Sequence, residues 1–104
     1  MTEQDIQNSI RIKLSEMGFA VFRTNVGKFK MEDGRWFDTG LPKGHTDLYA
    51  VRDGKIYYIE VKKPGGKVGD AQKSFIETMK TRYGCTAGIV FSVEEAVELV
   101  NGGP

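Results

Sequence analysis

One stretch decides the fold of this chain: residues 44–62, with the sequence GHTDLYAVRDGKIYYIEVK. Two runs rich in β-branched and aromatic residues flank the dipeptide Asp53-Gly54. An Asp-Gly dipeptide between such runs is the strongest short-range signal of a β-hairpin. A two-residue type I′ loop at this dipeptide pairs Arg52 with Lys55. The sequence therefore predicts a central hairpin and also its register.

That register places two carboxylates directly across from one another. Asp47 lies opposite Glu60 and His45 opposite Lys62, so that Asp47, Glu60 and Lys62 share one face. Cross-strand Cβ atoms are only about 4.5–5.5 Å apart, and like charges at that spacing are destabilising. A divalent cation removes the repulsion, since Mg²⁺ binds one or two carboxylates together with substrate phosphates. Two interpretations stay open: a metal site at which Lys62 holds a water or phosphate oxygen, and a solvated face with ordinary salt bridges.

Length and composition indicate one globular domain. The chain has 104 residues, 39% of them hydrophobic and 28% charged, with a net charge of +1. We expect a single domain over residues 1–101 and a frayed tail at 102–104. No apolar run approaches the ~20 residues that span a bilayer, and the acidic N-terminus is no signal peptide. The single cysteine, Cys85, excludes an internal disulfide and fits a core position in a cytoplasmic protein without a membrane partner.

The remaining elements follow from hydrophobic period and stop signals. We expect helices over residues 2–17, 70–83 and 93–100 and strands over residues 19–25 and 86–91. Asp70 is the expected N-cap of the second helix. With the hairpin, the order is αβββαβα, which implies an α/β fold with a mixed sheet flanked by helices. The crossover through the second helix predicts that strand 86–91 runs parallel to the second hairpin strand.

Residues 27–43 form a Gly- and Lys-rich stretch with interspersed aromatic residues. We expect a loop or a short irregular hairpin around Asp33-Gly34. Its mixture of basic and aromatic residues suits a nucleic-acid backbone or a second subunit. Alternatively, Trp36 and Phe37 cover the edge of the sheet.

Several polar residues are candidates for contact with nucleic acid. They lie at the end of the first strand, in the aromatic stretch, beside the hairpin glycine and in the turn after the hairpin: Arg23, Asn25, Lys28, His45, Lys63 and Lys67. The turn lysines either contact phosphate or are simply solvated.

At this point the ordered motifs resemble the PD-(D/E)xK nuclease superfamily. Within it, the likeness is to the small stand-alone VRR-NUC domains of phages and bacteria. The motifs that carry it are Glu3 with Ile6-Gln7, Arg23-x-Asn25-x-Gly27, Gly44-His45-x-Asp47-Leu48, Ile59-Glu60-Val61-Lys62 and Gln72-x-x-Phe75. They span nearly the whole chain, with Thr46 where the pattern often has Pro. The resemblance implies a restriction-endonuclease-like core in the cytoplasm of a bacterial or phage-infected cell.

The resemblance also implies a role for each site residue. Asp47 and Glu60 would ligate Mg²⁺ or Mn²⁺, helped by the Val61 carbonyl, and Glu3 would complete the site. Lys62 would orient or activate the attacking water. Gln72 would support the site from its helix. No small-molecule cofactor is implied.

The implied function is metal-dependent, structure-selective cleavage of DNA. The family is known for homodimers that act on branched DNA, including four-way (Holliday) junctions. An alternative is a DNA-binding or assembly module that keeps the nuclease fold and acts only with a partner protein. A further alternative places His45 beside Asp47 in a transition-metal site such as zinc.

Overall fold

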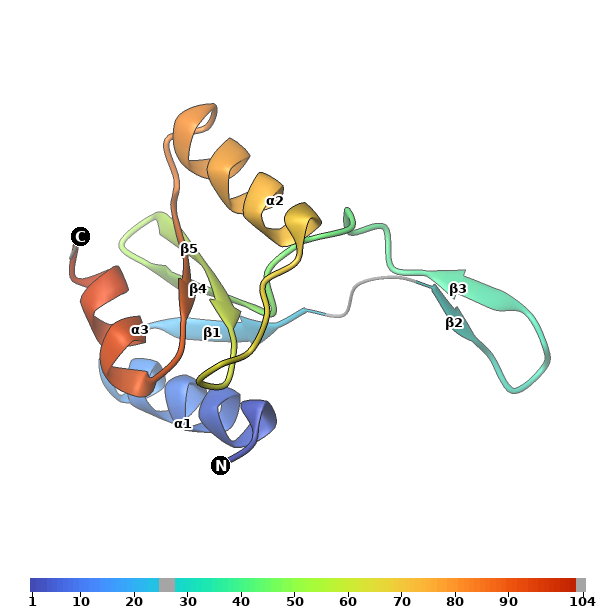
Figure 1. The fold of residues 1–104 in the computed structure, drawn as a ribbon, viewed down its shortest axis with the longest axis horizontal. Coiled ribbons are helices and arrows are strands. Elements are labelled where there is room, and N and C mark those ends of the chain that lie inside the picture. The colour runs from blue at the N-terminus through green and yellow to red at the C-terminus, as the bar shows by residue number, and fades with distance from the viewer. Residues whose placement is uncertain (25–27, 103–104) are drawn as a thin grey trace.

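A computed structural model describes residues 1–24 and 28–102, without the side chain of Phe29. The elements are α1 (Glu3–Glu16), β1 (Ala20–Arg23), β2 (Lys28–Lys30), β3 (Trp36–Asp38), β4 (Leu48–Arg52), β5 (Lys55–Val61), α2 (Asp70–Thr81), β6 (Thr86–Val90) and α3 (Val93–Val100). Apart from the short β2 and β3, this is the predicted αβββαβα order (Figure 1).

The principal sheet has four strands in the order β1-β4-β5-β6. The pairs β1–β4 and β4–β5 are antiparallel, whereas β5 and β6 are parallel. The parallel pair confirms the crossover predicted for α2, and the mixed α/β sheet confirms the expected fold class.

The central hairpin has the predicted turn. Asp53 and Gly54 adopt positive φ angles of 54° and 77°, the conformation that a type I′ loop requires at both positions. Arg52 pairs with Lys55, and the ladder continues without a slip to Leu48 and Ile59. The register on which the predicted site depends is therefore confirmed.

The two faces of the sheet carry different layers. The core lies between the sheet and the helices α1 and α3, while α2 covers the other face (Figure 1). Because side chains alternate along β5, Ile59 and Val61 point into this core, and Tyr58 and Glu60 point to the α2 face. The apolar stripe of α1 is buried against the sheet as predicted, with Ile6, Ile10 and Leu14.

The helix starts are partly as expected. Thr2 caps α1, and its hydroxyl and backbone N–H exchange hydrogen bonds with Asp5 in a capping box. The N-cap of α2 is Gly69, so the prediction of Asp70 was wrong. The Gln72 side chain bonds the Gly69 N–H at 3.0 Å and takes over the capping role, which leaves Asp70 as the first helical residue.

The strands β2 and β3 form a separate two-stranded sheet, here called the arm (residues 28–38), which projects from the body (Figure 1). The predicted hairpin around Asp33-Gly34 is confirmed. Trp36 and Phe37 remain 68% and 56% exposed. The alternative in which they cover the edge of the principal sheet is therefore wrong.

Two smaller expectations concern Cys85 and the membrane. Cys85 is half-buried rather than a full core residue. None of the helices within residues 1–24 and 28–102 is long and apolar enough to cross a bilayer.

Candidate active site

Asp47 and Glu60 meet where the β4–β5 ladder ends. The Asp47 Oδ2 accepts a hydrogen bond of 3.0 Å from the Val61 N–H, and the Glu60 Oε1 accepts one of 3.1 Å from the Asp47 N–H. Each carboxylate thus accepts a hydrogen bond from a backbone N–H that would bond a backbone carbonyl if the strand pairing extended further. The predicted proximity of the two acids is confirmed, and it is fixed on both sides by main-chain donors.

The prediction that His45 lies opposite Lys62 is wrong. The backbone pairing stops at Leu48 and Ile59, so His45 does not lie opposite Lys62. Its ring packs against Phe75 and Tyr58, with centroids 4.7 and 5.7 Å away, and its Nδ1 lies 2.9 Å from the Thr46 carbonyl oxygen. His45 therefore belongs to the contact between this loop and α2.

Lys62 and Gln72 complete the surroundings of Glu60. The Lys62 Nζ lies 3.5 Å from the Glu60 Oε2, and the Gln72 amide donates to the same oxygen. The Glu60 side chain is only 1% exposed and that of Lys62 15%. Both oxygens of Glu60 are consequently engaged, and α2 is tied to the site through Gln72.

Burial disfavours the charged form of both acids. Burial raises the pKa of Glu60 to about 7, with a further increase from the Asp47 charge that Lys62 opposes. Burial also raises the pKa of Asp47, and the Glu3 charge adds to this, while the Val61 N–H and Lys62 lower it. The structure therefore brings Glu3 within electrostatic reach of Asp47.

The donor set suits a hard divalent cation. The buried carboxylate of Glu60 and the half-buried carboxylate of Asp47 have one nearby cation, Lys62, and a second positive charge would favour their ionised forms. The Val61 carbonyl lies on the same edge of β5 as its N–H, which faces Asp47. Among the residues that the structure describes, no three His, Cys, Asp or Glu side chains form a metal-binding group. Mg²⁺ tolerates such an open site because it keeps waters and substrate oxygens as ligands. Zinc sites use at least three protein ligands. Among the described residues, His45 and Asp47 have no third His, Cys, Asp or Glu with which to form a zinc site.

The family model of the VRR-NUC domain matches residues 1–94. The chain belongs to the VRR-NUC domain family. This is a family of nuclease domains. A solved structure described as a VRR_NUC domain is similar in fold, with a TM-score of 0.69 and 21% sequence identity over 97% of each chain. No curated protein matches the chain.

Two threonines of this VRR-NUC domain bond the backbone at Asp47 and next to it, and sequence reasoning gave neither a role. The Thr24 N–H donates to the Asp47 carbonyl at 2.8 Å, and its hydroxyl contacts the carbonyls of Thr46 and Asp47. The Thr46 hydroxyl is buried and donates to the Leu48 carbonyl at 3.1 Å. No spacing rule connects Thr24 with Asp47. The only sequence signal was its place between Arg23 and Asn25.

A third missed residue is Gln7, one turn after Glu3 on α1. Gln7 is 8% exposed, and its Oε1 finds no hydrogen-bond partner among the described residues. The sequence motif had included Gln7 beside Ile6 without a role.

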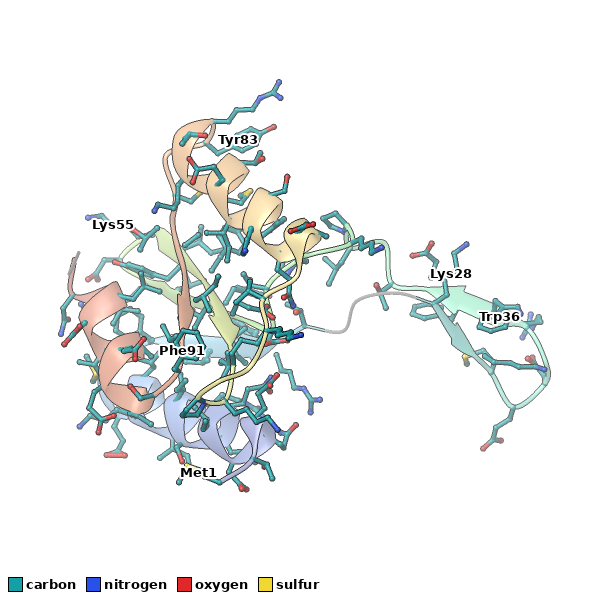
Figure 2. All side chains as sticks on the ribbon, in the orientation of Figure 1. Met1, Lys28, Trp36, Lys55, Tyr83 and Phe91 are labelled. Carbon is teal, nitrogen blue, oxygen red and sulfur yellow. The ribbon has the colours of Figure 1, made fainter. Side chains whose placement is uncertain are left out.

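The residues predicted to contact nucleic acid do not all lie on the face of the sheet that carries Glu60. Arg23 pairs with Leu48, whose side chain points into the α1 core, so Arg23 lies on the face away from Glu60. Lys63 and Lys67 are exposed in the turn that follows Lys62. Figure 2 shows Lys28 on the arm, away from the body. Asn25 lies outside the described residues.

An open cleft of about 420 Å³ lies beside Asp47, at the start of α2. Besides Asp47 and Gln72, its lining includes Thr24, Lys43 and His45. His45 and Asp47 thus border one cleft, although the His45 ring packs on Phe75. Lys43 was not among the predicted DNA contacts.

Gly44 allows the loop that lines this cleft to pass close to α2. Its φ is +90°, and a Cβ there would lie 2.2 Å from the Ala71 carbonyl oxygen. We expect Gly44→Ala to push the loop from α2 and to loosen the Gln72–Glu60 contact. Gly40→Ala is the matched control, because Gly40 has φ +80° and no atom within 4 Å of its Cβ position.

Urea unfolding measures this difference. Both variants lose stability because L-residues disfavour positive φ. Gly44→Ala should cost about 1–3 kcal/mol more than Gly40→Ala, the usual range for overpacking. Equal losses in the two variants would contradict the close approach of Gly44 to Ala71.

Proposed function

We propose that this VRR-NUC domain is a divalent-metal-dependent endonuclease that hydrolyses phosphodiester bonds in branched DNA such as four-way junctions. The observation that carries the proposal is the pair of the half-buried Asp47 and the buried Glu60, with Lys62 in ion-pair contact with Glu60. Burial raises the pKa of both acids, and the Asp47 charge raises that of Glu60 further. Such groups lower stability in their charged form and concentrate at functional sites.

The chemistry assigns a role to each residue. Asp47, Glu60 and the Val61 carbonyl would hold Mg²⁺ or Mn²⁺, with Glu3 contributing from α1. A cation bound there supplies Lewis-acid polarisation of the phosphate and a lowered pKa for an attacking water. Lys62 orients that water and directs a positive charge at the phosphate. Gln72 holds Glu60 in place as a positioning residue.

A homodimer is part of the proposal. A two-fold dimer presents two active sites, and that is the geometry needed to cut two symmetric strands of a junction. The candidate DNA contacts are Arg23, Asn25, Lys28, His45, Lys63 and Lys67. Of these, Lys63 directly follows Lys62, Lys67 lies four residues further on, and both are exposed.

The experiment compares three labelled substrates: a four-way junction, a nicked flap and a plain duplex. Each is incubated with Mg²⁺, Mn²⁺ or EDTA. We expect metal-dependent cutting of the junction at symmetric positions and at least tenfold slower cutting of the duplex. Cutting of the flap alone would support the assignment of the active site and contradict the proposed preference for four-way junctions. Binding without cutting would favour the alternative, a module that acts only with a partner protein.

A further inference from the structure

A row of aromatic side chains crosses the α2 face of the principal sheet. Phe22 on β1 pairs with Tyr49 on β4, and Tyr49 pairs with Tyr58 on β5. The neighbours of Tyr49 on β4 point into the core on the other side, so the row lies on the α2 face. Phe75 of α2 packs edge-on against Tyr58 at one end of the row. The row therefore begins beneath α2 and ends at Phe22 on the edge strand β1.

The ring at the outer end of this row is open to solvent. Phe22 is 46% exposed, and within the described residues it is the only exposed large hydrophobic side chain of the principal sheet. The Tyr49 ring is stacked behind it, with centroids 5.0 Å apart and planes at 23°, and so fixes its orientation. An aromatic side chain can bury about 150–250 Å², so the exposed part of Phe22 offers roughly 70–115 Å². A standard protein interface buries roughly 800 Å² per partner, and a single flat ring is better matched to one nucleobase.

The aromatic row runs beside the candidate active site. On each of the three strands, a residue at the site lies two positions from the aromatic residue, toward the same end of the sheet. These residues are Thr24, Asp47 and Glu60. Hydrogen bonds join the Thr24 N–H to the Asp47 carbonyl and the Asp47 N–H to the Glu60 carboxylate. Since residues two apart on a strand are about 6.5–7 Å apart on one face, the acids and the aromatic row are close neighbours.

This spacing fits one DNA strand that passes from the acids to Phe22. Nucleotides follow one another at about 3.4 Å along a duplex strand, so a phosphate at the acids places a base one or two nucleotides away beside the aromatic row. Lys43 is exposed and lines the cleft beside Asp47, where its charge favours the DNA backbone. Inside a duplex, both faces of a base are covered by its neighbours. Only a base at an interruption of the stack has a free face for Phe22.

We infer that Phe22, supported by the Tyr49 ring, stacks on a DNA base that has lost a stacking neighbour at the branch point of the substrate. This inference rests on the proposed function and names the feature of branched DNA that the protein recognises. Stacking of a base on an aromatic side chain changes affinity by about 5- to 150-fold. A duplex without an interruption lacks this contribution, and Phe22 is then a specificity-determining residue.

DNA binding in EDTA and low salt tests the inference on the junction, the flap and the duplex. Phe22→Leu keeps an apolar side chain and removes the flat ring. We expect its affinity for the junction to fall about 5- to 150-fold, and its affinity for the duplex to change by less than about twofold. Phe22→Tyr keeps the ring and should bind the junction within about threefold of the wild type. Tyr83→Leu should bind as the wild type does, because Tyr83 is an exposed aromatic residue beyond the far end of α2 (Figure 2).

Removal of single bases beside the branch point identifies the base that contacts Phe22. At one position, an abasic site should lower the affinity of the wild type by about the same factor as Phe22→Leu does. The same abasic site should lower the affinity of Phe22→Leu no further, because the two changes remove one shared contact. A cooperative thermal transition shows that Phe22→Leu is folded, and Phe22→Met, which also lacks the ring, replaces it otherwise.

Four outcomes would overturn the inference. They are an unchanged affinity of Phe22→Leu for the junction, an equal loss for junction and duplex, the lack of any shared abasic position, and a wild type that binds no DNA. If the wild type binds only the flap, the same comparisons on the flap decide. None of these measurements uses metal or cleavage. A protein that shows these effects and cuts nothing would retain the inference and contradict the proposed endonuclease, and cleavage of the junction with unchanged binding by Phe22→Leu would do the reverse.

Discussion

The Glu60→Gln protein is expected to fold and to cut junction DNA at least about 100-fold more slowly than the wild type. The substitution keeps an amide oxygen that can accept the Asp47 N–H, but it removes the charge from a nearly fully buried group. A cation at this site would then lose one of its two ionised ligands. Since loss of an outer-shell partner of a metal ligand already costs about 10–100-fold, loss of a ligand should cost at least as much as the upper value.

Single-turnover cleavage at saturating Mn²⁺ measures this effect, and a cooperative thermal transition shows that the variant is folded. Glu98→Gln is the matched control, because Glu98 is an exposed glutamate on α3. It should retain wild-type activity. A Glu60→Gln protein that cuts at more than a tenth of the wild-type rate would contradict the assignment of Glu60 to the metal site.

The second large effect is the pH dependence of stability in the metal-free protein. The pKa of Glu60 is about 7 in the folded chain against an ordinary value of 4.5. The folded state therefore binds the proton more tightly than the unfolded state, and stability falls as pH rises between these two values. A shift of this size corresponds to about 3 kcal/mol lost between pH 4.5 and pH 7. The pKa of Asp47 is also raised and acts in the same direction.

Urea unfolding in the presence of a chelator, at pH 5 and at pH 8, measures this loss. Glu60→Gln should remove most of the pH dependence, because Gln does not titrate. Adding Mn²⁺ at pH 8 should raise the wild-type stability and leave Glu60→Gln much less affected, since the cation favours the ionised pair. A wild-type protein that is equally stable at both pH values would show that burial does not raise the pKa of Glu60 in the folded chain.

The sequence predicted the parts of the site that local rules determine. Asp53-Gly54 sets a type I′ turn, and this turn fixes the register that brings Asp47 to Glu60. The position of Lys62 follows from strand alternation alone.

What the sequence could not predict depends on tertiary contacts. The bonds from Thr24 to the Asp47 backbone join residues 23 positions apart, through packing that no periodicity reports. The extension of the register to His45 was wrong because side chains replaced the ladder at Asp47. Likewise, the composition of residues 27–43 suited a covered sheet edge and a projecting arm equally well. Only the fold shows that β2 and β3 pair with each other and form the projecting arm.

The hydrogen bond that the Val61 N–H donates to the Asp47 carboxylate has an evolutionary consequence. This acid also terminates a strand pair, so selection for foldability alone can retain an acceptor at position 47 after activity is lost. Asn can accept the same bond, and a descendant chain could therefore pass from cutting DNA to binding it through one isosteric substitution without refolding. On the proposed function, we expect an oxygen acceptor at position 47 in relatives to report on the architecture, and charge at positions 47 and 60 together to be the better marker of a working nuclease.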